Sequence, residues 1–408
     1  MKICIWMTKI FDLGGTKRVV SLLANELVKE HDVTIMTYED RFLEDRTMYH
    51  LSEDIDVDFI DNNHFVNRHW NFAFAKRYLV KKLNDKFGIF NKKCFNDLLA
   101  ESIFPKKTRD KWVEYLNSKD YDVIITTASL SLRLGMIAPR LNAATIGWQH
   151  NCYDGYLHVK PVVFWQQECL LQEYLPNLDR YIVLSKYDQR DYMEKLGIDT
   201  EVKINPRSFV SEKKCNVKSK RFLMATRFVY AKGLDLMMES FEEFCKEDSE
   251  WELDILGDGK LFGQIKADAK NRHLEDRVHF VGYTNEPEKY YLNSSVFLLP
   301  SRWEGWPMVI MEAFEFGLPV IAYHMGAMDL IIDDGKTGFL PEAFDPHKFA
   351  QAMLKIAHDE GLRAQMSANA IAKSEDFSID KAVAAWDDLF ERVVAKKKGA
   401  GTNESHRK

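Results

Sequence analysis

The chain has 408 residues, of which 46% are hydrophobic and 29% charged, and its formal net charge is −6. These proportions are typical of a globular protein and exclude a disordered or fibrous chain, and the length predicts two domains rather than one. No stretch approaches the roughly 20 apolar residues that cross a bilayer, so we expect no transmembrane segment.

The cysteines and the first residues indicate a cytoplasmic protein. The six cysteines are scattered without a CxxC pair, which argues against a structural zinc site and favours a reducing compartment. The opening MKICIWMTKIFDLGG has one short apolar run and no small-residue cleavage site. We therefore interpret it as a first strand rather than a signal peptide.

Apolar segments of strand length recur through the first half of the chain. The predicted strands are KICIWMTKI, DVTIMTYE, DVDFIDN, YDVIITTA, AATIGWQHN and DRYIVLSK. A glycine turn at Gly14 and Gly15 separates the first strand from TKRVVSLLANELVKE, which has helical spacing. Because strands with two apolar faces alternate with helices, we predict a parallel sheet of the doubly wound α/β class.

A basic and aromatic insertion at about 65–115 interrupts this alternation. Between Arg68 and Asn96 lie eight Lys or Arg and one acid, Asp85, a local charge of +7 that leaves −13 for the rest of the chain. Its aromatic residues are Trp70, Phe72, Phe74, Tyr78, Phe87, Phe90 and Phe95. Residues 68–96 can bind an anionic membrane surface, or they form a solvated helical hairpin whose aromatics pack on their own domain. Nucleic acid is disfavoured, because the remainder is acidic and has no recognition motif.

The alternation restarts after a lysine-rich stretch at 200–220, the best linker candidate. Further strands are predicted in RFLMATRF, WELDILGDG, RVHFVGY, SVFLLPS and PVIAYH, with helices between them. We predict an N-terminal domain at 1–205, a C-terminal domain at 206–375, and a helix with a loose tail at 376–408. Ligands of doubly wound folds bind beyond the carboxyl ends of the strands, so we expect the site in a cleft between the two sheets.

Two glutamates in SRWEGWPMVIMEAFEFGLPVIAY are the first candidate site residues. Glu304 follows a predicted strand, and Glu312 lies one to two turns into a helix that begins near Pro307. Amides at that helix N-terminus attract phosphate, whereas a carboxylate repels it, so each acid would bind a hydroxyl of a sugar or ribose. The alternative is that Glu304 caps the helix and Glu312 faces solvent.

Three other loops carry further candidates. Arg227 and Lys232 follow the first strand of the second domain, where two cations suit a departing diphosphate. The glycine pair exposes amides but lacks the GxGxxG spacing, which weakens a nicotinamide interpretation. His150 ends a strand of the first domain. Taken singly, Arg227 is also explained as a surface arginine, Lys232 as a lysine at a helix start and His150 as a structural histidine.

Taken together, the chain resembles glycosyltransferase family 4, the retaining, nucleotide-sugar-dependent enzymes of GT-B fold. The resemblance is strongest from Arg221 to Leu340, in ATRFVYAKG, ILGDGK, VHFVGYTNE, LLPSRWEGWPMVIMEAFEFGLPVIAY and DDGKTGFL. It implies two Rossmann-like domains facing a central cleft, with a C-terminal helix that can cross back to the first domain.

The resemblance also implies roles for individual residues. Arg227 and Lys232 would bind the donor diphosphate, Glu312 the ribose hydroxyls and Glu304 the transferred sugar, which His150 would also contact. The remaining donor contacts would come from Gly15 against the phosphate or sugar, from Gly282, Tyr283 and Thr284 around the base, and from the backbone of Gly305, Trp306, Pro307, Met308 and Val309. No metal and no other cofactor are expected.

Two features bear on the limits of this resemblance. Many relatives have Gly-Gly-Ala-Glu where this chain has Gly14-Gly15-Thr16-Lys17, a loop on the acceptor side, so the acceptor stays open. Asp56 and Asp58 imitate the metal-binding DxD of another glycosyltransferase fold, but they alternate with apolar residues as on a half-exposed strand. That alternation favours a structural role.

The implied activity is that of a hexosyltransferase that retains configuration. It would move a sugar from a nucleotide-sugar, with UDP first and GDP second, to a glycan or a lipid-linked acceptor of bacterial capsule, exopolysaccharide or envelope. Such an enzyme would be cytoplasmic and peripheral on the inner membrane face. The alternatives are a nucleotide-sugar epimerase of the same fold and a non-catalytic partner subunit, against which the joint presence of the two cations and two acids argues.

Overall fold

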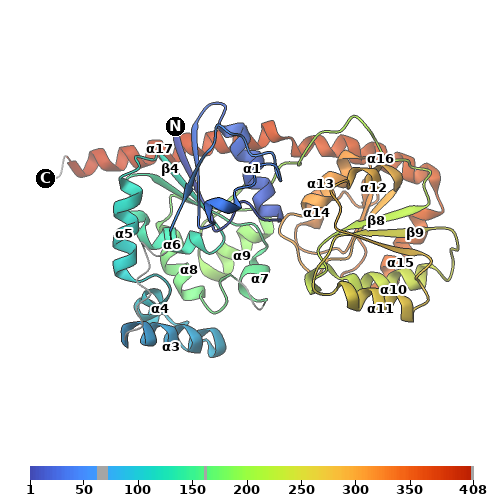
Figure 1. Ribbon diagram of the computed structural model, residues 1–408, viewed down its shortest axis with the longest axis horizontal. Helices are drawn as coiled ribbons and strands as arrows, with labels where there is room; N and C mark the ends of the chain where they lie inside the picture. Colours follow the sequence, from blue (N-terminus) through green and yellow to red (C-terminus); the bar gives the residue numbers. More distant parts are fainter. Residues whose placement is uncertain (62–71, 160–162, 406–408) are drawn as a thin grey trace. The chain divides into compact units, whose positions relative to one another are not determined.

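The computed structural model describes residues 1–61, 72–159 and 163–405, and the chain forms two compact units (Figure 1). Unit 1 comprises Met1–Asn205 and Ile379–Lys408, and unit 2 comprises Pro206–Ser378. The chain thus enters unit 2 once and returns to unit 1 for its last helix. Arg68 and Trp70 of the basic insertion lie outside the described residues.

Unit 1 is built on a seven-stranded parallel sheet of order β3-β2-β1-β4-β5-β6-β7. Its strands are β1 (Lys2–Trp6), β2 (Asp32–Thr37), β3 (Asp56–Phe59), β4 (Val123–Thr127), β5 (Ala144–Trp148), β6 (Arg180–Val183) and β7 (Glu201–Val202). Strand β1 pairs with β2 on one side and β4 on the other, so the winding reverses there as in doubly wound folds. β4 and β5 are buried along their whole length, which explains their unbroken apolar sequence.

Nine α-helices of unit 1 are described. They are α1 (Gly15–Leu27), α3 (Phe72–Phe87), α4 (Asn96–Ile103), α5 (Lys106–Asn117), α6 (Leu130–Ile137), α7 (Tyr153–Leu157), α8 (Glu168–Tyr174), α9 (Lys186–Leu196) and α17 (Ile379–Ser405). Single 3-10 turns lie at Arg41–Leu43, Lys93–Phe95, Ala138–Arg140 and Leu175–Asn177. Over the described parts of the chain, no helix combines the length and the apolar character that crossing a bilayer requires.

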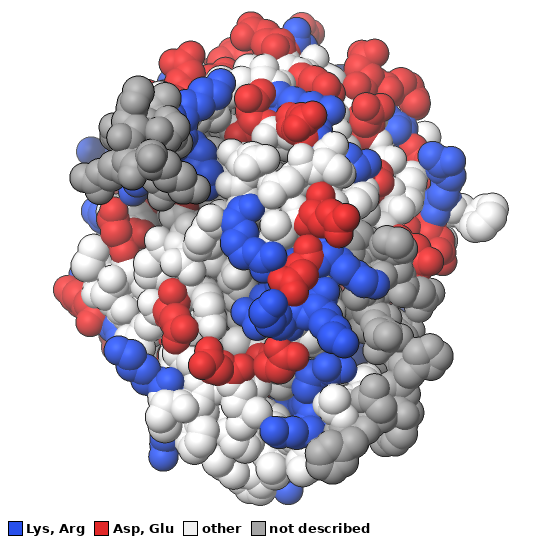
Figure 2. Space-filling model, turned by 90° about the vertical axis from the view of Figure 1, so that its left-hand side faces the viewer, with Lys and Arg blue, Asp and Glu red and all other residues white. Residues whose placement is uncertain are grey.

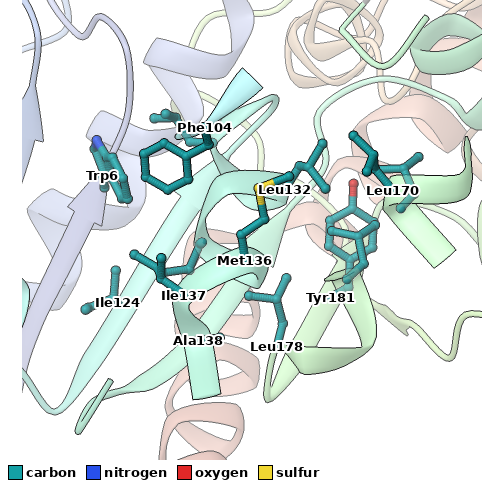
Figure 3. Packing of buried hydrophobic residues seen from close by; sticks show 14 of the residues in the cluster. Trp6, Phe104, Ile124, Leu132, Met136, Ile137, Ala138, Leu170, Leu178 and Tyr181 are labelled. Atoms are coloured by element: carbon teal, nitrogen blue, oxygen red, sulfur yellow. The ribbon is translucent and has the colours of Figure 1, made fainter. Parts of the chain in front are cut away.

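The core of unit 1 lies between its sheet and the helices α5, α6 and α8. Figure 3 shows Trp6 of β1, Ile124 of β4 and Tyr181 of β6 in one packed layer with α6. Trp6 also stacks on Trp112 of α5, with ring centroids 4.3 Å apart. Each fully buried large apolar side chain contributes about 1.5–3 kcal/mol to folding, so this layer fixes the positions of the strand ends that follow it.

The last helix, α17, packs on unit 1, which confirms that it crosses back to the first domain. Trp386 meets Trp148 of β5 edge-on at 4.7 Å, and Asp387 pairs with His31 at 3.0 Å. The helix continues to Ser405, further than the loose tail predicted from Gly399. The tail contains no proline that would stop the helix.

Unit 2 repeats the architecture with a six-stranded parallel sheet of order β10-β9-β8-β11-β12-β13. Its strands are β8 (Arg221–Ala225), β9 (Glu252–Leu256), β10 (Val278–Gly282), β11 (Val296–Leu299), β12 (Val320–Ala322) and β13 (Gly338–Phe339). Its helices are α10 (Leu234–Phe244), α11 (Phe262–Asn271), α12 (Glu288–Asn293), α13 (Met308–Glu315), α14 (Met328–Ile331), α15 (Pro346–Ala357) and α16 (Glu360–Ser374), with 3-10 turns η5 (Tyr230–Lys232) and η6 (Glu375–Phe377). Both predicted doubly wound units are therefore present.

Candidate active site

The site in unit 2 is built where two neighbouring strands end. β8 and β11 run parallel, with Phe222 opposite Val296, so the loops that follow them emerge side by side at the carboxyl edge of the sheet. The loop after β8 leads through Arg227 and η5 into α10, and the loop after β11 leads through Glu304 into α13. Residues far apart in sequence are thereby brought together.

Lys232 and Glu304 form the centre of this arrangement. The Lys232 Nζ lies 2.6 Å from Glu304 Oε1, and the two side chains are 19% and 10% exposed. The hydroxyl of Ser301, which is buried, donates to the same carboxylate oxygen at 2.7 Å. The carboxylate is therefore oriented by a cation and a hydroxyl in a poorly hydrated setting, where such bonds are stronger than in bulk water.

Hydrogen bonds of Arg302 connect the loop after β11 to the loop after β8. Its backbone N–H donates to Ala231 O at 2.7 Å and its guanidinium to Tyr230 O at 2.9 Å. The same guanidinium grips Asp235 with two bonds of 2.8 and 2.6 Å, which raises the pKa of Arg302 and lowers that of Asp235. Arg302 stands two residues before Glu304 and bonds to residues on both sides of Lys232 in the sequence. These bonds keep Lys232 close to Glu304.

Gly233 makes this approach of the loops sterically feasible. It adopts a φ of +63°, and a Cβ atom there would lie 1.9 Å from Pro300 O at the end of the neighbouring strand. Only glycine combines the left-handed conformation with so close a backbone contact. The glycine that follows Lys232 is therefore a requirement of the packing.

Glu312 lies within α13, and its burial shows that the alternative in which it faces solvent is wrong. The side chain is buried; its carboxylate accepts hydrogen bonds from Ser208 Oγ at 3.1 Å and Tyr291 OH at 3.2 Å. The capping alternative for Glu304 is also wrong, because the N-cap of α13 is Pro307, with no side-chain cap bond. Both acids hold positions that are buried or nearly so without a role in helix termination.

The other predicted site residues of unit 2 follow the ends of β8, β10 and β11 at the same edge of the sheet. Arg227 is exposed and, over the described residues, forms no ion pair. At the end of β10, Gly282 has a φ of +78°, Tyr283 is exposed, and Thr284 Oγ1 accepts from Glu286 N at 3.0 Å. Gly305, Trp306, Pro307 and Met308 are buried, and Val309 is partly so.

In unit 1 the glycine loop follows β1 and starts α1. The Gly14 N–H donates to Tyr49 OH at 2.8 Å. A Cβ on Gly15 would meet nothing within 4 Å, so packing within the described chain does not require this glycine. Lys17, which departs from the common motif, pairs with Asp12 at 3.8 Å.

His150 follows β5 at the same edge of the unit 1 sheet as the glycine loop. Its ring lies 4.2 Å from that of Trp148, and both ring nitrogens are shielded from solvent and have no hydrogen-bond partner among the described residues. This burial lowers the pKa of His150 to about 3. The imidazole is therefore neutral at physiological pH, with one N–H to donate and one nitrogen to accept.

A buried hydrogen-bond network holds the His150 loop. Gln149 Oε1 accepts from Tyr181 OH at 3.2 Å and Tyr192 OH at 2.6 Å, while its Nε2 donates to Asn151 O at 2.6 Å. The sequence analysis did not single out Gln149, Ser301, Arg302, Tyr291 or Ser208. Gln149 adjoins His150, and Ser301 and Arg302 stand in the same motif as Glu304. No signal in the sequence pointed to Tyr291 or Ser208.

The Asp56–Asp58 pair lies on β3 and is engaged structurally. Asp58 pairs with Lys119 at 3.2 Å and accepts a hydrogen bond from Tyr115 OH. Across the parts of the chain that the structure describes, no group of three or more His, Cys, Asp or Glu is arranged to hold a metal ion.

The part of the chain that contains the unit 2 site is similar to a known protein family. Residues 208–373 match the model of the family Glycosyl transferases group 1. An uncharacterized glycosyltransferase of Haemophilus influenzae is 26% identical over 399 residues, which cover 95% of this chain and 99% of that protein. A UDP-Gal:alpha-D-GlcNAc-diphosphoundecaprenol alpha-1,3-galactosyltransferase of Escherichia coli is 33% identical over 145 residues, 35% of this chain and 37% of that one. Apart from the Haemophilus protein, the relatives compared are covered over 27% to 60% of their own length.

Solved structures share the fold over nearly the whole chain. TarM of S. aureus, crystallised with fondaparinux, alpha-GlcNAc-glycerol and UDP, superposes with a TM-score of 0.74 at 17% identity, covering 96% of this chain and 100% of that one. The predicted fold class, two Rossmann-like α/β domains of the GT-B glycosyltransferases, is thereby confirmed.

Proposed function

We propose that this chain, whose unit 2 contains a Glycosyl transferases group 1 domain, is a retaining hexosyltransferase that uses a UDP-sugar. The observation that carries the proposal is the contact of Lys232 with Glu304 at the carboxyl edge of a sheet inside the matched region. The galactosyltransferase relative is named for a UDP-sugar donor, and the TarM crystal contains UDP, which supports uridine as the base.

The proposed reaction separates charge, and fixed positive charges beside the leaving group would favour it. As the bond from the anomeric carbon to phosphate lengthens, positive charge grows on the sugar and negative charge on the leaving diphosphate. The ammonium of Lys232 and the guanidinium of Arg227 would stabilise the diphosphate, and preoriented groups of this kind are worth most where water is excluded. Arg227 has no competing ion pair within the described chain.

Donor binding would exchange partners at the central ion pair. Lys232 now neutralises Glu304, and a diphosphate beside Lys232 would take over its charge. Glu304, still oriented by Ser301, would then accept a hydrogen bond from a hydroxyl of the transferred sugar. Glu312 would exchange Ser208 or Tyr291 for the ribose hydroxyls in the same manner.

No carboxylate is assigned as a covalent nucleophile. We assign front-face attack by the acceptor hydroxyl, with its proton leaving toward the departing phosphate oxygen and Glu304 steering the sugar. His150, neutral because of its burial, would hydrogen-bond a sugar hydroxyl rather than carry charge. The acceptor is a glycan or lipid-linked sugar of a bacterial polysaccharide or envelope pathway, which the lipid-linked acceptor in the name of the Escherichia coli relative supports.

The decisive experiment measures donor binding first and transfer second. Thermal shift with UDP-, GDP- and ADP-sugars should single out a UDP-sugar, and that donor should be consumed when membrane extract is added, including in EDTA. The double variant Lys232→Ala with Glu304→Gln should lose transfer and keep its fold, while Lys246→Ala, an exposed lysine beyond α10, should match the wild type. A fully active double variant would refute the assignment, and epimerisation without acceptor would identify an epimerase instead.

A further inference from the structure

Helix α3 and the turn after it carry a concentration of positive charge that the proposed reaction does not use. Between Phe72 and Phe95 there is one acid, Asp85, and seven cations: Lys76, Arg77, Lys81, Lys82, Lys86, Lys92 and Lys93. None of the seven forms an ion pair with any described residue. Figure 2, which faces the end of the molecule where Figure 1 shows α3 to α5, shows a band of Lys and Arg running down that end.

Helix α5, also in unit 1, shows that cations of this unit can have acidic partners. Lys106 pairs with Asp110 at 3.2 Å, and Asp110 also pairs with Arg140 at 2.7 Å. Arg109 pairs with Glu101 at 3.5 Å. These cations of α5 thus have acidic partners from their own unit, whereas the seven cations of α3 and the following turn have none among the described residues.

Large apolar side chains are exposed among the α3 cations. Tyr78 and Leu79 are each 55% exposed, Phe87 60% and Ile89 44%. Lys82 lies over the Tyr78 ring at 5.8 Å, and Lys86 over the Phe87 ring at 4.9 Å. Tyr78, Lys82 and Lys86 are spaced four apart and share a helix face, and Phe87 meets Lys86 at the end of the helix, so apolar and cationic groups are interleaved on this exposed surface.

The opposite side of α3 is anchored, so this exposure does not come from a loosely attached segment. Val80 and Asn84 are buried. Asn84 donates to Gln166 O at 2.6 Å and accepts from Phe90 N at 3.1 Å, and α3 packs on α4, which packs on α8. Phe90 also packs on Phe95 at 5.4 Å, so part of the aromatic set faces its own domain while Tyr78 and Phe87 do not.

We propose that the α3 face, defined as Tyr78, Leu79, Lys82, Lys86, Phe87 and Ile89 with the flanking cations, docks on an anionic lipid bilayer. Ammonium groups on long aliphatic stems meet lipid phosphates while aromatic and aliphatic side chains enter the interfacial layer. A soluble polyanion would engage the cations but would not require exposed leucine, phenylalanine and isoleucine. The inference is independent of donor and acceptor, since it depends only on this surface.

The test is co-sedimentation of the whole chain with vesicles of phosphatidylcholine alone and with added phosphatidylglycerol. The wild type should bind only the anionic vesicles. Lys82→Gln with Lys86→Gln should weaken binding about tenfold or more, because each cation near such a surface contributes appreciably. Leu79→Ser with Phe87→Ser should weaken it several-fold, and the charge-matched control Lys106→Gln with Lys107→Gln on α5 should bind like the wild type.

Three outcomes would overturn the proposal. The first is a wild type that does not bind anionic vesicles. The second is an α5 control that loses as much binding as the α3 variant, which would indicate diffuse charge rather than a face. The third is a serine variant that binds vesicles like the wild type while soluble polyphosphate displaces both, which would identify a polyanion site. Circular dichroism and the melting temperature, both measured without nucleotide, show in each case that the variants are folded.

Discussion

The two sheets end in edges of different chemistry. In unit 2 the loops beyond β8 and β11 carry two ion pairs, Lys232 with Glu304 and Arg302 with Asp235, beside the exposed Arg227. In unit 1 the loops beyond β1 and β5 carry a glycine pair and His150, whose ring nitrogens have no partner among the described residues and whose burial keeps it neutral. One edge is charged and preoriented, and the other presents glycine backbone and a neutral ring.

This difference matches the two demands that sugar transfer makes. A departing diphosphate needs fixed positive charge, which costs no reorganisation when the groups are already held in place. A sugar hydroxyl can be bound by neutral donors and acceptors, for which an amide or imidazole suffices. In the proposed reaction unit 2 would supply the first and unit 1 the second, so substitutions at the two edges should differ in kind as well as in size.

The largest effect is expected at Lys232, on the charged edge. Lys232→Ala removes the cation and leaves Glu304 without its counter-ion, so kcat for transfer should fall about 10²- to 10³-fold, as when a preoriented transition-state donor is lost. Lys232→Arg keeps the charge and should lose less. If the alanine and arginine variants had the wild-type kcat, the charged edge of unit 2 would have no part in the chemistry. The proposed difference between the two sheet edges would then be wrong.

A stability effect on the neutral edge should come next in size, and it depends on pH. His150 has a pKa of about 3 in the folded chain, against about 6.5 when unfolded. Between these values only the unfolded chain binds the proton, so the free energy of unfolding should fall as the pH drops below 6.5, by about 2 kcal/mol at pH 5. His150→Gln should abolish this dependence.

Urea unfolding at pH 7 and pH 5 measures the His150 effect directly. The control is His158→Gln, because His158 is half exposed and pairs with Asp154 at the surface. Its variant should keep the acid loss of the wild type. If the free energy of unfolding had the same pH dependence in the wild type and in His150→Gln, the His150 ring would be hydrated and able to bind a proton in the folded chain. The unit 1 edge would then not differ from the unit 2 edge by being neutral.

The fold could be predicted, and candidate site residues could be identified, because their signals are local and repeated. Continuous apolar strands alternating with helices predicted both sheets, and missed only two-residue strands such as β7 and β13, which are too short to show a period. Glu304 and Lys232 were identifiable because each stands in a distinctive motif. The motif did not predict that they contact each other, because that follows from the pairing of β8 with β11.

The supporting residues could not be predicted, because their roles come from tertiary contacts. Tyr291 reaches Glu312 from α12 and Ser208 reaches it from the start of unit 2, and neither has a sequence signal. Gln149 is polar yet fully buried at a strand end, a position that only the two tyrosines bonded to it explain. Residues that position other residues are recognised only when their partners are known.

The smallest effect is expected at Ser301, which tests whether the charged edge depends on orientation as well as on charge. Its hydroxyl donates to the Glu304 oxygen that also contacts Lys232, so Ser301→Ala leaves the ion pair but frees the carboxylate to rotate. We expect kcat to fall about fivefold, near the 1 kcal/mol of a typical hydrogen bond, with donor affinity unchanged. Ser301→Thr keeps the hydroxyl and should restore most of the rate, and both should melt like the wild type. A threonine variant as slow as alanine would show that packing at this buried position, rather than the hydrogen bond, sets the rate.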